Sequence, residues 1–119
     1  MTQIANLTKK RAPRIFWKKI AGGILGKKYD LSVVLAGNSL MEKLNIRYRK
    51  QNKPASVLSF PISAEEGEIF INLGQKRYLP LFLFIHALLH LKGFEHGAKM
   101  KVQEQKALKK YGKKYHSRT

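Results

Sequence analysis

The sequence predicts an α+β domain in which helices cover a small mixed β-sheet and one helix is buried at the centre. Three observations lead to this class. The chain has 119 residues, the size of one domain that can bury its own core. Short β-branched segments alternate with longer segments of helical periodicity. One helical segment, which begins at Pro80, is too apolar to lie on a surface, so we expect it at the centre of the fold.

The first half of the chain predicts a helix, a strand and a second helix. Apolar side chains four residues apart indicate a docked, basic helix over residues 14–25. Residues 29–35 (YDLSVVL) indicate a strand, because β-branched residues precede a Gly-Asn stop. A helix over residues 38–49 follows, with Ser39 and Glu42 at the spacing of a capping box. Its apolar face is expected to comprise Leu40, Leu44 and Tyr48.

The second half predicts two strands followed by two helices. The strands are expected over residues 55–61 and 66–73, joined by a short turn. Pro80 suits the first turn of the central helix because its missing N–H would have no partner there. Gly93 is expected to end that helix, and a last helix is expected over residues 98–111.

The charge of the chain indicates a polyanionic partner. There are 24 Lys and Arg against 7 Asp and Glu, a formal net charge of +17. Such a charge says more about partners than about fold, and nucleic acid is the usual polyanion. We expect a single domain over residues 1–119, with mobile basic tails at residues 1–12 and 113–119.

Two absences from the sequence narrow the possibilities. The chain has no cysteine, so disulfides and thiolate metal sites are excluded. No run of about 18 apolar residues is present, so we expect no transmembrane helix and no membrane partner. Lys18 and Lys19 also interrupt the only segment that resembles the apolar core of a signal peptide. The cytoplasm is the simplest compartment.

Three of the four histidines of the chain lie within residues 85–97, in the pattern H-x-x-x-H-x-x-G-x-x-H. His86 and His90 are four residues apart, which places both on one face of a helix. Gly93 permits the turn that returns His96 toward the same face. Three imidazoles plus a water form an open zinc site, in which the fourth position is free for chemistry. The pattern therefore predicts a catalytic metal site rather than buried core histidines.

The residue after His86 separates two kinds of hydrolase. Metzincin proteases share this histidine spacing but need Glu directly after the first histidine as general base. Here that position is Ala87, which cannot accept a proton. Phosphodiester hydrolysis depends more on neutralising phosphoryl oxygens, which a metal and an arginine can do. The sequence therefore favours a nuclease over a protease.

Several blocks of the sequence resemble the YbeY endoribonuclease family of bacterial ribosomal-RNA maturation factors. HALLHLKGFEH resembles the family signature H-G-x-L-H-L-x-G-Y-D-H, and LNIRYRKQNKPASVLSFP resembles a second block, L-N-x-x-Y-R-x-x-D-x-P-T-D-V-L-S-F-P. GEIFIN is similar to the strand that follows, and Met100, Glu104 and Leu108 resemble the segment after the last histidine. These blocks span residues 44–108. Departures include Asn52 and Ser56, which stand where the family has acids.

The resemblance implies a role for each candidate site residue. His86, His90 and His96 would hold one Zn²⁺ together with a water, and His86 would thereby take part in catalysis. Arg49, which matches the Arg of the family's Tyr-Arg pair, would act on the RNA phosphate, since Arg can form two hydrogen bonds with one phosphate. Glu95 and Glu104 are candidates to orient histidines as acceptors.

The resemblance also implies a process and partners. The expected activity is a single-strand-specific, zinc-dependent endoribonuclease that matures the 3′ end of the small-subunit ribosomal RNA and acts in ribosome quality control. Its partners would be ribosomal RNA and the small ribosomal subunit, with ribosomal proteins or assembly GTPases as further candidates. Two alternatives are a non-catalytic ribosome assembly factor with a structural zinc and, less favoured because of Ala87, a metzincin-like metalloprotease.

Overall fold

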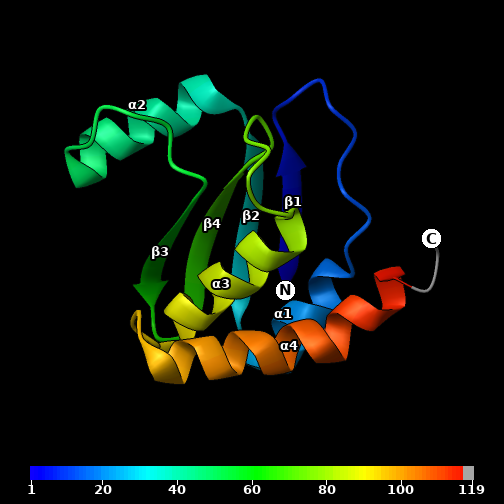
Figure 1. Ribbon diagram of the computed structural model, residues 1–119. Helices are drawn as coiled ribbons and strands as arrows, with labels where there is room; N and C mark the ends of the chain where they lie inside the picture. The colour runs from blue at the N-terminus through cyan, green and yellow to red at the C-terminus, as the bar shows by residue number, and fades with distance from the viewer. Residues whose placement is uncertain (117–119) are drawn as a thin grey trace.

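A computed structural model describes residues 1–116 and shows four strands and four helices within them (Figure 1). In chain order they are β1 (Thr2–Asn6), α1 (Trp17–Leu25), β2 (Asp30–Ala36), α2 (Asn38–Arg49), β3 (Val57–Ser63), β4 (Glu66–Asn72), α3 (Pro80–Lys92) and α4 (Ala98–His116). This arrangement confirms the predicted α+β class.

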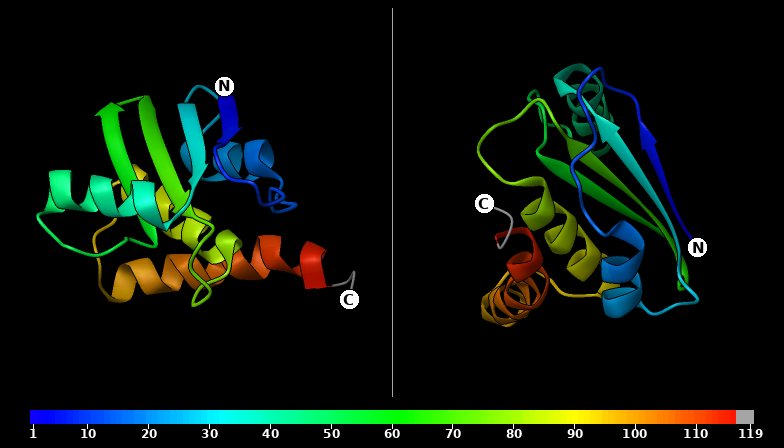
Figure 2. Two further views of the ribbon diagram at one scale, coloured as in Figure 1. Left: turned by 90° about the horizontal axis from the view of Figure 1, so that it is seen from above. Right: turned by 90° about the vertical axis from the view of Figure 1, so that its right-hand side faces the viewer.

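The strands form one mixed sheet in the order β1-β2-β4-β3. β1 and β4 pair in parallel with β2, whereas β3 pairs antiparallel with β4 and forms one edge of the sheet. Successive side chains of a strand point to opposite faces, and the two faces are covered differently. α1, α3 and α4 lie on one face (Figure 2). α2 packs on the other, where Met41 contacts a small cluster that includes Leu58.

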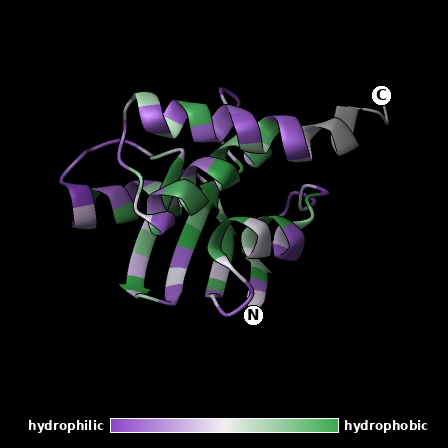
Figure 3. Cartoon of the chain, turned by 90° about the horizontal axis from the view of Figure 1, so that it is seen from below, coloured by the Kyte–Doolittle hydropathy of each residue, from purple (hydrophilic) through white to green (hydrophobic). Residues whose placement is uncertain are grey.

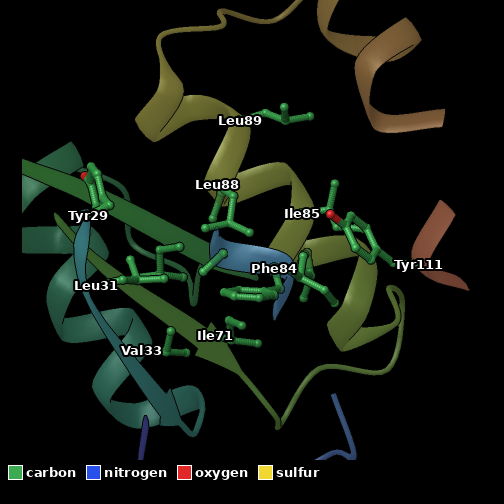
Figure 4. Close-up of a cluster of buried hydrophobic side chains, with 14 of the residues drawn as sticks. Tyr29, Leu31, Val33, Ile71, Phe84, Ile85, Leu88, Leu89 and Tyr111 are labelled. Carbon is green, nitrogen blue, oxygen red and sulfur yellow. The ribbon is translucent and has the colours of Figure 1, made fainter. Parts of the chain in front are cut away.

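α3 is the central helix of the fold, as the sequence predicts. Phe84, Ile85 and Leu88 are fully buried, and Figure 4 shows Phe84 and Leu88 directed toward the side chains of β2 and β4. α3 is almost uniformly hydrophobic, whereas α4 is mostly hydrophilic with a hydrophobic inner face (Figure 3). Burying apolar side chains such as those of α3 away from water makes the main favourable contribution to the free energy of folding.

The expectation of a mobile tail over residues 1–12 was wrong for residues 2–6, which form β1. This strand has four exposed residues out of five. Its sequence therefore lacks the alternation of apolar and polar residues that marks a half-buried strand. Main-chain pairing with β2 holds it in place, with Ile4 opposite Val33.

The predicted start of the second helix was also wrong in detail. The N-cap of α2 is Gly37, and no side chain caps this helix, so Ser39 and Glu42 do not form a capping box. The buried residues of α2 are Met41 and Asn45. Of the predicted face, Leu40 and Leu44 pack partly buried against the cluster of Met41, whereas Tyr48 is exposed. Asn38 instead accepts a 2.8 Å hydrogen bond from the side chain of Asn72.

Two helix ends differ from the prediction. α1 begins at Trp17 rather than at residue 14. α4 continues past residue 111 to His116, so part of the predicted tail over 113–119 is helical. Residues 117–119 of that tail lie outside the part of the chain that the structure describes.

Candidate metal centre

The end of α3 and the turn after it bring the three histidines of the predicted site together. The Nε2 atom of His90 lies 3.1 Å from that of His86 and 3.1 Å from that of His96. One ligand atom from each residue lies within 4.8 Å of the others. Gly93 makes this possible with a φ of 112°, a left-handed conformation that ends the helix. The sequence spacing thus produces three converging imidazoles.

The second ring nitrogen of two histidines is fixed by an acceptor. Nδ1 of His86 lies 3.2 Å from Oε2 of Glu104, and Nδ1 of His90 lies 3.0 Å from the carbonyl oxygen of Phe94. A carboxylate and a carbonyl only accept hydrogen bonds, so both Nδ1 atoms carry the proton. The Nε2 atoms of His86 and His90 then present lone pairs on the side where His96 also lies. Lone pairs that converge in this way suit a bound cation.

The spacing of the nitrogens also suits a metal ion. In a tetrahedral site with Zn–N distances of about 2.0–2.1 Å, two ligand nitrogens lie about 3.3 Å apart. The observed separations of 3.1 Å are close to this value. The three histidines could therefore hold one metal ion in the geometry that the structure shows.

The environment of His90 favours the neutral form that a ligand needs. Burial lowers the pKa of His90, and the neighbouring His86 lowers it further. The hydrogen bond to Phe94 and the carboxylate of Glu104 act in the opposite direction but do not outweigh these effects. A metal competes with protons for imidazole nitrogen, so a lowered pKa makes the lone pair available at neutral pH.

The two acidic candidates differ in position. Glu104 is 7% exposed on the inner face of α4, one turn from the buried Met100, and its carboxylate contacts His86. Glu95 is exposed, and no hydrogen bond or ion pair joins it to another residue within 1–112, where side chains are described. The geometry expected of an orienting acceptor is present at Glu104 and not at Glu95.

The histidines open into a groove of about 900 Å³ between α3, the edge strand β3 and the segment after α2. Arg49 lines the same groove, as do Lys53 and Arg77. No acidic residue is among the lining residues. The structure therefore places the predicted arginine in the same groove as the predicted metal site, and the charged side chains that line this groove in the described part of the chain are all cationic.

Several groove residues were not found from the sequence. They are Lys53, Arg77 and Phe82. The ring centroid of Phe82 lies 5.9 Å from that of His86. Phe82 and His86 are four residues apart on α3, so helical spacing could have revealed this contact. Arg77 lies in a loop, where no periodicity marks it.

None of the helices in the described part of the chain is both long enough and apolar enough to cross a membrane.

Comparisons with known proteins agree with this geometry. A family model described as Endoribonuclease YbeY matches residues 3–118. Endoribonuclease YbeY of Ehrlichia chaffeensis is 38% identical over 106 residues, covering 71% of this chain and 69% of the relative. That of Campylobacter jejuni is 37% identical over 97 residues, covering 68% and 71%.

A solved structure shows the same fold. The solution structure of a Thermotoga maritima protein is 21% identical in sequence and has a TM-score of 0.67. The match covers 99% of this chain and 93% of that one. At this identity the likeness establishes the fold alone.

Proposed function

Because the chain belongs to the YbeY endoribonuclease family, we propose that it is a zinc-dependent endoribonuclease that hydrolyses phosphodiesters of single-stranded RNA. One observation carries the proposal. Three imidazole nitrogens converge in a groove whose charged lining residues, Arg49, Lys53 and Arg77, are all cations. A site of this kind suits a polyanionic substrate.

The three histidines would bind the metal, and other groups of the chain orient the rings of two of them. His86, His90 and His96 supply the ligand nitrogens. Glu104 and the carbonyl of Phe94 fix the rings of His86 and His90 in the tautomer that binds metal. When bound, Zn²⁺ supplies Lewis acidity, which activates water and neutralises charge on phosphoryl oxygens. Three protein ligands leave a coordination position open for that chemistry.

Arg49 would position and neutralise the phosphate. It lines the groove together with the three histidines, on the last turn of α2. A guanidinium can donate two parallel hydrogen bonds to one phosphate and stays charged at all physiological pH values. Removing one such donor from a transition state typically costs about 10²–10³ in kcat.

The site gives no support to peptide hydrolysis. Ala87 follows His86 and is 1% exposed, so the place of the metzincin general base is occupied by a methyl group. Among the described residues no carboxylate lines the groove, so none of them replaces that base. A structural zinc in a non-catalytic assembly factor is also less well supported. Structural sites normally have four protein ligands, whereas the described residues bring three together.

Ribosomal RNA is the substrate that we propose. The net charge of +17 supports a large polyanionic partner, and the likeness to the family favours the 3′ end of small-subunit RNA and damaged ribosomes. The small ribosomal subunit would then be the main partner, with ribosomal proteins or assembly GTPases as additional contacts, and the protein would act in the cytoplasm.

Cleavage of single-stranded RNA by the purified, zinc-loaded protein tests the proposal. We expect His86→Ala to abolish cleavage and Arg49→Ala to slow it by about 10²–10³. Lys43→Ala is a matched control, because Lys43 is an exposed cation of the same helix that does not line the groove. Undiminished cleavage by His86→Ala, in a preparation free of other nucleases, would refute the proposal.

A further inference from the structure

A row of neighbouring rings begins at Tyr78, just before α3, and continues along that helix to the metal centre. The ring of Tyr78 stacks on that of Phe82, with centroids 5.7 Å apart and planes 26° apart. The ring of Phe82 in turn lies 5.9 Å from that of His86, at 31°. Tyr78 lies at the outer end of this row and is 38% exposed. All three residues line the groove.

A second row of rings lies on the α2 side of the sheet and reaches the same groove. Tyr48, on the last turn of α2, packs against Phe60 of β3 with centroids 5.1 Å apart. Phe60 packs against Phe70 of β4 at 5.8 Å. Tyr48 is 56% exposed, although its ring packs against that of Phe60. Both Tyr48 and Phe60 line the groove.

An arginine side chain lies close to the ring of each of the two exposed tyrosines. The guanidinium carbon of Arg77 lies 5.2 Å from the ring centroid of Tyr78. That of Arg47 lies 5.5 Å from the ring centroid of Tyr48. A single exposed tyrosine would need no explanation. Here two tyrosines line the groove of the metal centre. Each packs against a phenylalanine ring and has the arginine that precedes it in the chain close to its own ring.

Such a Tyr-Arg pair is a binding platform for an unpaired nucleotide. An aromatic ring or a guanidinium plane stacks on a base, while the cation also attracts the adjacent phosphate. Bases within a duplex are already stacked on their neighbours and cannot use such a platform without being pulled out. The groove volume of about 900 Å³ is near the upper end of the range for small-molecule pockets, about 300–1,000 Å³. It is therefore large enough for a segment of chain.

We propose that the Tyr48–Arg47 and Tyr78–Arg77 pairs stack bases on the two sides of the phosphate that reaches the metal centre. The inference rests on the proposed endoribonuclease function and deepens it by naming the residues that select single-stranded RNA. In this arrangement the two tyrosines are positioning residues. They fix where the strand lies, and the residues around the histidines act on the phosphate.

Binding of a short fluorescent single-stranded RNA, measured separately from cleavage, tests the proposal. Loss of one base–aromatic stack weakens binding by about 5- to 150-fold. We expect this loss for Tyr78→Ala and for Tyr48→Ala, and near-normal binding for Tyr78→Phe, which keeps the ring. Leu79→Ala is the matched control, since Leu79 is 72% exposed beside Tyr78 but does not line the groove.

An RNA series with a single abasic position moved along the strand probes the same contacts without changing the protein. At the position that stacks on Tyr78, removing the base should weaken binding to the wild-type chain and have no further effect on Tyr78→Ala. If both alanine variants bind within twofold of the wild type, or if no abasic position weakens binding, the stacking proposal is wrong.

The two proposals fail in different ways. A wild-type protein that binds RNA through stacked bases but never cuts it would contradict the endoribonuclease and leave the platforms standing. A wild-type protein that cuts RNA and ignores every abasic substitution would contradict only the platforms. Arg77→Gln adds a further readout, because a lost phosphate contact should reduce the salt dependence of binding by about one ion.

Discussion

The two parts of the candidate metal centre are built differently. His86 and His90 lie on a buried helix, and each has its second ring nitrogen against an acceptor outside the triad. His96 lies on an exposed turn between two glycines with positive φ, Gly93 and Gly97. Within residues 1–116, its ring contacts are with the other two histidines. Two ligands are thus held by the fold, and the third is held by the triad itself.

From this difference we infer which histidines contribute most to the free energy of metal binding. Preorganised ligands bind without first losing conformational freedom, whereas a residue on an exposed turn loses that freedom on binding. His86 and His90 should therefore contribute most of the metal affinity, and His96 should contribute a smaller part. The predictions that follow test this division.

The largest effect is expected for His90→Ala. His90 is the central member of the triad, with its Nε2 atom 3.1 Å from those of both other histidines. Its removal should reduce zinc from one ion per chain to none by elemental analysis. His96→Ala should retain weaker but measurable binding. Equal losses in the two variants would contradict the division between helix and turn.

Glu104→Gln should weaken metal binding by about 10- to 100-fold, the usual effect of losing an acceptor behind a ligating histidine. The amide still accepts a hydrogen bond from His86 but no longer brings a negative charge. A competition titration with a zinc chelator measures the change. Glu95→Gln is the control, because Glu95 is exposed and forms no hydrogen bond or ion pair with the described histidines of the triad; an equal effect there would point to general electrostatics instead.

Gly93→Ala should destabilise the fold by about 1–2 kcal/mol, since a Cβ disfavours the left-handed conformation in which Gly93 is held, with φ of 112°. No atom lies within 4 Å of the Cβ position, so the cost is conformational rather than steric. Urea unfolding measures it. Gly22→Ala within α1 also meets open space and should stabilise, by up to about 1 kcal/mol. Stabilisation by both would show that the turn is not constrained.

The smallest effect concerns pH. Because the pKa of His90 is lowered in the folded protein, the unfolded chain binds its proton more readily. Stability of the metal-free protein should therefore be fully present above the unfolded value, about 6.5, and should fall as pH drops below it. Thermal unfolding across that window measures the trend, and His90→Gln should reduce it. A rise in stability on acidification would contradict the direction.

Features that depend on local sequence patterns could be predicted from the sequence. α3 was predicted with its Pro80 start and Gly93 end because continuous apolar residues and two backbone-restricted residues leave few alternatives. The histidine spacing is a local pattern, so the triad followed from helix geometry for His86 and His90 and from the turn at Gly93 for His96. The contact of Glu104 with His86 matched the candidate role that one helix face suggested.

Features that depend on tertiary pairing were not predictable in this way. β1 was missed because an exposed strand is held by main-chain hydrogen bonds, which leave no mark on side-chain pattern. Ser39 matched a capping box, yet the chain enters α2 from Gly37. Arg77 reaches the groove from a loop that is far in sequence from Arg49, and only the packing of α3 against β3 brings the two together.

A zinc titration of the metal-free protein, followed by single-stranded RNA cleavage, shows directly whether the three histidines hold a catalytic ion. If the three histidines hold the catalytic ion, activity should be absent without metal, rise with added zinc and saturate at one ion per chain. His90→Ala should stay inactive throughout. Full cleavage by rigorously metal-free protein, or by His90→Ala, would contradict the account.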